Sequence, residues 1–238
     1  QEDQLKSEEE SVKLSSEFMD LSLPSKGATR GQVHPVTKVE RKISEILKQY
    51  GFQNALGPEI DNEYYCFDAL NFPPEHPARD IMDTFYTDTK EEGTINMLRT
   101  HMTALSARSM KAQTLPLKIS AFGRVYRNET EDATHQSMFH QFDMVWIDKG
   151  INTSDLMGIC THIIKEVYGQ KRKVNFVPKY YPYTEPSLGL RIDCTLCNGE
   201  GCPSCGGSGW VTVAGAGMLY RNVLEEFNYN PDEVGGIA

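Results

Sequence analysis

Features that would place a chain in a specialised class are scarce or missing in these 238 residues. No apolar run is long enough to cross a membrane and no secretory leader is present, so we expect neither membrane insertion nor secretion. Only six cysteines occur, and four of them fall within twelve residues, which is not the pattern of a secreted disulfide framework. We therefore expect a reducing, cytoplasmic location.

Positive charge is also scarce. The chain has a net charge of -9, which argues against a general nucleic-acid binder, although residues 1–20 hold seven acids against two lysines and account for much of the excess. One short basic run could contact RNA phosphates or could be a solvated loop, and the sequence leaves both readings open. It consists of Lys165, Lys171, Arg172, Lys173 and Lys179.

The chain does contain clear periodic segments. Residues 1–32 are charged and serine-rich, which predicts the end of a helical region followed by a linker. Beyond them, amphipathic spacing predicts helices at 36–50, 97–113 and 153–168, with Gly51 and Gly169 as stops. Extended segments are predicted at 57–60, 117–129 and 138–148, and residues 72–90 read as a proline-rich irregular excursion. Hairpin-connected strands interrupted by helices indicate an α+β fold with an antiparallel sheet flanked by helices.

The four clustered cysteines form two CxxC pairs with glycines after each pair. They are Cys194, Cys197, Cys202 and Cys205, within residues 194–209. Two thiolates two residues apart can share a tetrahedral metal, and four close its coordination shell, so the spacing predicts a small structural zinc knuckle. Iron in place of zinc, and a pair of reactive dithiols or disulfides, remain alternatives.

A pair of opposite charges marks the two central strands. Arg127 and Glu129 are two residues apart and should leave the same face of the first strand. The guanidinium suits a phosphate and the carboxylate suits an exocyclic amine, as in a nucleotide site. An ordinary surface ion pair is the alternative.

The segment that contains this pair, GRVYRNETEDATHQSMFHQFDMVWID, resembles the second signature motif of class II aminoacyl-tRNA synthetases. Further blocks follow the pattern of the alpha subunits of bacterial phenylalanyl-tRNA synthetases: HPVTKVERKISEILKQYGF, GPEID, FDALNFPPEHPARD, MLRTHMT, YYPYTEPS and GAGM. The resemblance runs from about residue 31 to residue 238. It implies that residues 33–238 form the catalytic core, with residues 194–209 inserted as the zinc knuckle.

The same resemblance implies an activity and its partners. The family activates phenylalanine with ATP and Mg²⁺ and transfers it to tRNA(Phe), as the alpha chain of a heterotetramer with two beta subunits. The N-terminal helical hairpin and the third signature motif of the family are absent here, so we expect a piece of a longer alpha chain that is inactive alone. A non-catalytic synthetase-like module that binds a partner or RNA is the alternative.

The family's functional positions transfer to this sequence one by one. Arg127, as the catalytic residue, would bind ATP with Glu129 and His135, while Glu185 would share Mg²⁺ with the beta subunit. The amino acid would be bound by His101, Thr103, Phe139, Gln141, Asp143, Tyr181, Tyr183 and Ala216. Within this set, Gln141 and Asp143 would hold the ammonium group, and the glycines on either side of Ala216 would leave room for a ring.

Three departures from the family pattern bear on specificity. Asp143 stands where the family has glutamate, one methylene longer. Ser106 lies near the position of a missing glutamine, which leaves Ser106 without an assigned role. Tyr181 and Tyr183 replace two phenylalanines, and their hydroxyls leave open how the pocket distinguishes phenylalanine from tyrosine.

Overall fold

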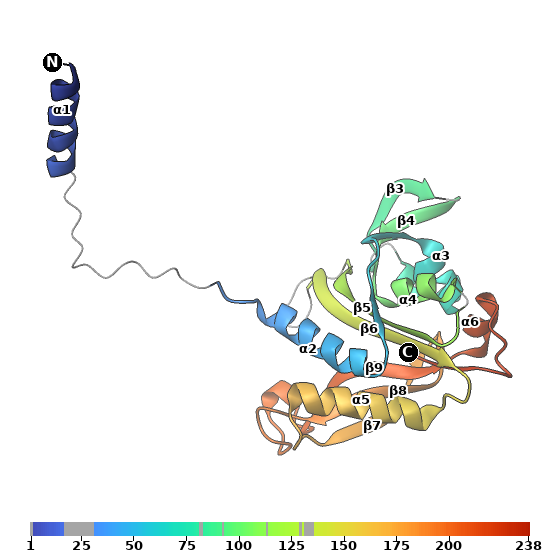
Figure 1. The fold of residues 1–238 in the computed structure, drawn as a ribbon. Coiled ribbons are helices and arrows are strands. Elements are labelled where there is room, and N and C mark those ends of the chain that lie inside the picture. The colour runs from blue at the N-terminus through green and yellow to red at the C-terminus, as the bar shows by residue number, and fades with distance from the viewer. Residues whose placement is uncertain are drawn as a thin grey trace. The chain divides into compact units, whose positions relative to one another are not determined.

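The structure is a computed structural model and describes residues 2–16, 31–80, 83–91, 93–112, 114–128, 130 and 136–238 (Figure 1). The chain divides into two units, residues 1–34 and residues 35–238. The first unit contains the helix α1 (Glu2–Ser16), with exposed side chains from residue 3 to residue 13. All other helices and strands belong to the second unit. No helix in the described ranges is long and apolar enough to span a membrane.

A seven-stranded sheet forms the centre of the second unit, in the order β1-β5-β6-β10-β9-β8-β7. Neighbouring strands are antiparallel except for β1, which runs parallel to β5. Their bounds are β1 Gln53–Ala55, β5 Leu117–Tyr126, β6 Met138–Asp148, β7 Val174–Tyr181, β8 Thr184–Asp193, β9 Trp210–Leu219 and β10 Gly235–Ile237. The predicted α+β class with a large antiparallel sheet is confirmed.

Helices cover both faces of this sheet. Helices α2 (Pro35–Gln49) and α5 (Thr153–Tyr168) lie along one face and share a core with Met144 of β6 (Figure 1). Helices α3 (Glu63–Cys66), α4 (Thr103–Met110) and α6 (Arg221–Glu226) contribute to a second core with Val145 and Ile147. Because side chains alternate along a strand, the odd-numbered residues of β6 face the α4 side.

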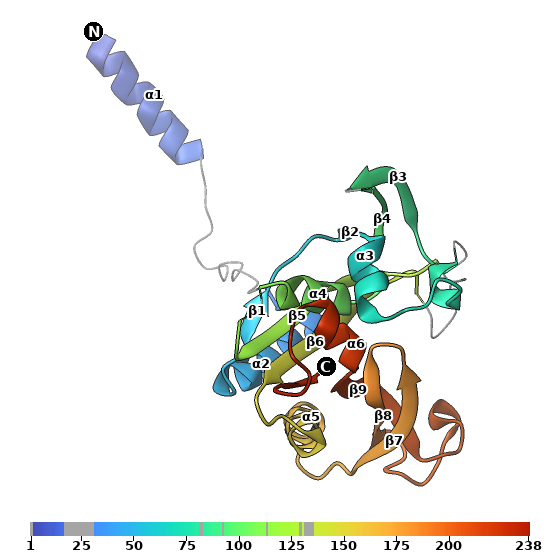
Figure 2. The ribbon, with the colours of Figure 1, turned by 90° about the vertical axis from the view of Figure 1, so that its right-hand side faces the viewer.

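A smaller sheet of three strands stands beside the α3 and α4 region. Its order is β2-β4-β3, from β2 (Ile60–Asn62), β3 (Tyr86–Glu91) and β4 (Thr94–Leu98). The β3–β4 hairpin extends away from the main sheet (Figure 2). Two short 3-10 helices, η1 (Asp68–Leu70) and η2 (Pro77–Arg79), precede it, and a third, η3 (Pro203–Cys205), lies between β8 and β9. Residues 72–90 are therefore more regular than the sequence indicated.

Two predicted helices match the structure closely, and local chemistry explains their ends. The predictions 36–50 and 153–168 correspond to α2 and α5. Asn152 and Asp155 form a reciprocal capping box at the start of α5, which satisfies backbone N–H groups that have no partner within the helix. Gly51 follows α2 with a φ of 83°, a conformation that glycine adopts without steric cost.

The helix predicted at 97–113 is wrong in its first part. Met97 and Leu98 belong to β4, and α4 begins only at Thr103. Strand pairing of Met97 with Asp61 overrides the local helical periodicity, because it buries Met97 completely. The predicted segment 57–60 also shifts, since the strand there is β2.

Candidate functional site

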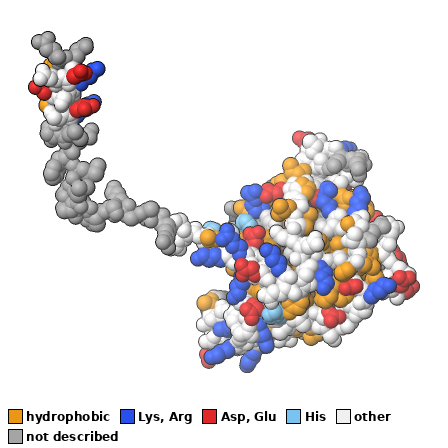
Figure 3. All heavy atoms as spheres, in the orientation of Figure 1, with side chains coloured by type: hydrophobic (Ala, Val, Ile, Leu, Met, Phe, Trp, Pro, Cys, Tyr) orange, Lys and Arg blue, Asp and Glu red, His pale blue; other side chains and the backbone are white. Residues whose placement is uncertain are grey.

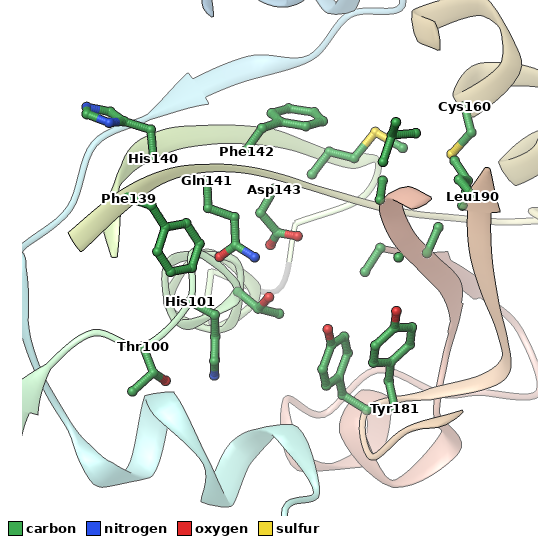
Figure 4. Close-up of a pocket in the computed structure, with 18 of the residues that line it drawn as sticks. Thr100, His101, Phe139, His140, Gln141, Phe142, Asp143, Cys160, Tyr181 and Leu190 are labelled. Atoms are coloured by element: carbon green, nitrogen blue, oxygen red, sulfur yellow. The ribbon is translucent and has the colours of Figure 1, made fainter. Parts of the chain in front are cut away.

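One cavity of about 1030 Å³ gathers most of the residues that the sequence singled out. Its lining includes residues from both faces of β6, from α2 and α5, and from β7, β8 and β9 (Figure 4). The predicted site residues that line it are His101, Thr103, Arg127, Phe139, Gln141, Asp143, Tyr181, Tyr183 and Ala216. Glu129 and His135 lie outside the described residues. Glu185 is exposed and does not line this cavity.

The central wall comes from β6. Phe139, Gln141 and Asp143 project from one face of the strand, while His140 and Phe142 project from the other (Figure 4). The Gln141 carboxamide oxygen accepts a hydrogen bond from the backbone N–H of Met102 at 2.8 Å. Because a backbone N–H can only donate, this contact fixes which end of the amide is oxygen. That oxygen keeps a second lone pair for a ligand.

Asp143 lies deep in the cavity and is held by hydroxyl groups. The Ser106 hydroxyl donates to its Oδ2 atom at 2.5 Å, and Thr103 provides a second side-chain hydrogen bond. Burial raises the pKa of Asp143 to about 6, while these hydrogen bonds act in the opposite direction. Ser106 thus supports the shorter carboxylate, and this contact gives Ser106 the role that sequence comparison left open.

Arg127 follows directly after the end of β5, which is Tyr126. The expectation that it lies within the strand is wrong by one residue. Its Nε atom donates to the Thr100 carbonyl at 3.4 Å, and its guanidinium lies 5.1 Å from the centre of the Phe139 ring. A guanidinium over an aromatic face is attracted to the ring's electron density, so Phe139 helps to orient the charge.

His101 is held on the opposite wall. Its Nε2 atom lies 2.9 Å from the Cys66 carbonyl, which can only accept, so Nε2 carries the proton. Nδ1 is then an acceptor, and it is buried without a hydrogen-bond partner among the described residues. Burial lowers the pKa of His101 to about 4, which keeps the imidazole neutral near pH 7. The ring stacks on Phe72 with centroids 6.0 Å apart.

Tyr181 and Tyr183 form an aromatic wall, with ring centroids 5.9 Å apart. Tyr183 shares a side-chain hydrogen bond with Thr103 and lies near Asp143, and burial raises the pKa of its phenol. The Tyr181 hydroxyl lies 2.3 Å from where a Cβ atom would stand at Gly215, and Thr184 takes the corresponding place at Gly217. The glycines therefore accommodate neighbouring side chains, whereas we expected them to leave room for a ligand ring.

The cavity wall also contains residues that the sequence did not single out as ligands, Phe72 and Thr100 among them. Phe72 packs on His101 and Tyr183, and Thr100 lies beside His101 (Figure 4). The proline-rich context of Phe72 did indicate a functional excursion, and Thr100 directly precedes a predicted site residue. Neither pattern indicated that these side chains would face the cavity, because that depends on tertiary contacts.

The four clustered cysteines converge at one point. Their Sγ atoms all lie within 4.8 Å of one another, and three of the pairs are separated by 3.7, 3.8 and 3.9 Å. A tetrahedron with metal–sulfur bonds of the zinc type has sulfur–sulfur edges of about 3.8 Å. Backbone N–H groups of Gly201, Cys202 and Gly209 donate to the sulfurs, which favours thiolates. These separations are far longer than a disulfide bond, and all six cysteines are free thiols.

Gly201 and Gly209 make this cluster possible. Both have positive φ values, and a Cβ atom at either position would lie within 2.6 Å of a carbonyl oxygen across the turn. Arg172 of the basic run pairs with Asp193, immediately before the first cysteine, at 3.0 Å. At least this member of the run therefore anchors the base of the knuckle.

Comparisons with known proteins agree with this geometry. Residues 18–238 match the family described as tRNA synthetases class II core domain (F). The phenylalanine–tRNA ligase alpha subunit of Caldicellulosiruptor saccharolyticus is 41% identical over 97% of this chain, which covers 66% of that protein. That of Protochlamydia amoebophila is 40% identical over 100% of this chain and 67% of that protein. The chain thus spans about two thirds of the length of these curated relatives.

Solved structures show the same fold at low sequence identity. The chain superimposes on a Desulfitobacterium hafniense pyrrolysyl tRNA synthetase with a TM-score of 0.59 and 15% identity, over 85% of this chain and 63% of that one. At this identity the similarity concerns the fold alone.

Proposed function

The chain belongs to the class II tRNA synthetases, among the alpha subunits of phenylalanine–tRNA ligase, and from this membership we propose that it is the catalytic chain that activates phenylalanine with ATP and transfers it to tRNA(Phe). The observation that carries the proposal is the convergence of Arg127, Gln141 and Asp143 on one cavity with an aromatic wall. This reaction requires a cation for the phosphate, polar groups for the ammonium and aromatic rings for the apolar side chain.

The first step of the proposed reaction joins the amino acid to AMP. A carboxylate oxygen attacks the α-phosphorus of ATP, the bond to the bridging oxygen breaks, and pyrophosphate leaves. Arg127 would hold the α-phosphate and the approaching carboxylate, which draws two negative groups together and offsets charge that develops in the transition state. A terminal ribose hydroxyl of the tRNA then attacks the carbonyl carbon and AMP leaves.

Amino-acid recognition would use the other walls of the cavity. Asp143, the second lone pair of the Gln141 oxygen and Nδ1 of His101 are acceptors suited to an ammonium group. Tyr181, Tyr183 and Phe139 would surround the ring, with Thr103 tying Tyr183 into the polar network. Ala216 would contribute to the end of the cavity. The contacts of Glu129 and His135 with ATP remain part of the proposal.

Metal ions and a partner chain complete the proposed enzyme. The sulfur separations and N–H donors of the knuckle fit zinc, which would supply structural cross-linking of residues 194–209. A magnesium ion at Glu185 would need ligands from the beta subunit, because Glu185 is exposed and lies apart from the cavity wall. The free thiols support a reducing, cytoplasmic location, and an α2β2 assembly follows the family.

The proposal is tested by ATP–pyrophosphate exchange. The alpha chain, extended to the length of its relatives and assembled with its beta subunit, should exchange label in the presence of phenylalanine and then charge tRNA(Phe). Arg127→Lys should reduce exchange by about a hundredfold or more, because a lysine cannot fork onto two oxygens. An assembled heteromer with no exchange for any aromatic amino acid would favour a non-catalytic binding module.

A further inference from the structure

Thr100 lies in the wall of the cavity and carries a buried hydroxyl. The residue is only 6% exposed, and its Oγ1 atom has no hydrogen-bond partner among the described residues. It lines the cavity beside His101, on the wall that faces Gln141 and Asp143 (Figure 4). Leaving a buried hydroxyl unpaired carries a desolvation cost, so such a group in a native protein calls for an explanation.

The surroundings of Thr100 show what kind of ligand would pair with it. Its own carbonyl accepts from Nε of Arg127, so the guanidinium lies against this residue. On the next residue, Nδ1 of His101 is a buried acceptor. The Thr100 hydroxyl and the Arg127 guanidinium suit a carboxylate, and Nδ1 of His101 beside them suits an ammonium group. These are the two charged groups of an α-amino acid.

We propose that the Thr100 hydroxyl donates a hydrogen bond to the carboxylate of the bound amino acid, beside Arg127. The assignment rests on the proposed function and adds a contact at the reacting group. The carboxylate is favoured over the ammonium because Asp143, Gln141 and His101 already offer acceptors to the ammonium. When the carboxylate becomes the mixed anhydride, the same hydroxyl can remain on its carbonyl oxygen.

Two substitutions separate this role from simple packing. Thr100→Val keeps the size and branching of the side chain and removes only the hydroxyl. If Thr100 has no ligand, this change should leave both binding and stability intact, because it deletes an unpartnered polar atom. Thr100→Ser removes the methyl group and keeps the hydroxyl donor. Its affinity for the amino acid should therefore stay near that of the wild type, in contrast to Thr100→Val.

The experiment compares phenylalanine with phenylalaninol, which carries a CH2OH group in place of the carboxylate, on the assembled full-length heteromer. Thr100→Val should raise the Kd for phenylalanine by about tenfold or more, since hydrogen bonds to charged groups are the stronger class. The Kd for phenylalaninol and the melting temperature should not worsen, and Thr100→Ser should stay near wild type.

Three other outcomes overturn the inference. An unchanged Kd for phenylalanine in Thr100→Val removes the contact, and an equal loss for both ligands shows general damage to the pocket. In both cases wild-type binding leaves the proposed function standing. A wild-type heteromer that binds neither ligand would overturn the proposed function and this inference together.

Discussion

At the scale of single residues, the proposed role of Asp143 in ammonium binding would link ligand affinity to pH. Its folded-state pKa of about 6 lies above the usual value near 3.9 for an unfolded chain, because burial opposes the charge. The protonated Asp143 carboxyl therefore makes its full contribution to the free energy of unfolding below about pH 3.9. This contribution is lost as the pH rises through about 6. An ammonium ligand reverses this preference, because it stabilises the carboxylate.

We accordingly predict that phenylalanine affinity rises with pH up to about 6 and then levels off. Below that value, binding must displace one proton, so affinity should fall by up to about tenfold per pH unit. Isothermal titration from pH 5 to 8 measures this dependence. Asp143→Asn is the control, since it cannot ionise, and a steep profile in that variant would assign the proton to another group.

Gln141 gives a second prediction at the residue scale. Gln141→Ala should weaken phenylalanine binding by about 1–3 kcal/mol while ATP binding stays nearly intact, because it removes an acceptor from the ammonium site. Separate titrations with each ligand measure the two effects.

A matched variant is needed because Gln141 also accepts from Met102 at the start of α4. Gln141→Glu keeps an acceptor for that N–H group and should retain the fold. Equal phenylalanine affinity in Gln141→Ala and the wild type would remove Gln141 from the site.

At the scale of elements, the cysteine knuckle behaves as a separate local unit joined to β8 and β9. Its turns depend on Gly201 and Gly209, and its base is held by the Arg172–Asp193 pair. Its sulfurs come from residues 194–205 alone, so a metal bound here would organise a short segment that contributes none of the cavity walls.

We predict one tightly held zinc per chain, found by elemental analysis of protein purified without chelators. Chelation or Cys197→Ala should increase hydrogen exchange in residues 194–210 far more than in β5 and β6, because the loop loses its cross-link. Cys160 is a buried cysteine in α5 outside the cluster. Cys160→Ala is therefore the control and should leave the metal content unchanged. Protein that holds neither zinc nor iron would refute the metal site.

At the scale of the whole molecule, the proposed beta subunit would need a surface on this chain, and exposed apolar residues of α2 and β2 are candidates for it. Val36, Val39 and Ile60 are 37–51% exposed. Exposed apolar side chains mark interaction surfaces where they form a continuous patch. This agrees with the heteromeric assembly proposed from the family.

Residues 1–238 alone should therefore give no measurable ATP–pyrophosphate exchange. Arg127 is the one arginine among the described residues that line the cavity, and a single guanidinium cannot balance the charge of a triphosphate. Preorganised electrostatic groups supply much of the rate in such sites. The measurement compares these residues with the full-length alpha chain assembled with beta. Robust exchange by residues 1–238 alone would contradict the prediction.

Local patterns were sufficient where chemistry acts over short distances. The period of 3.6 residues and the caps predicted α2 and α5, and the spacing of the two CxxC pairs predicted the convergence of their sulfurs. The strand predicted at residues 138–148 matches β6, and alternation along a strand places Phe139, Gln141 and Asp143 on one face. Neighbours in the sequence determine each of these features, so the sequence alone was enough.

Tertiary structure decided the features that depend on distant partners. Pairing with β2 made Met97 part of a strand, and Tyr181 filled the space over Gly215. The contact between Ser106 and Asp143 joins a helix to a strand 37 residues away, and the backbone carbonyl of Thr100 accepts from Arg127, 27 residues further along the chain. No local pattern encodes such contacts, because they form only when the elements pack together.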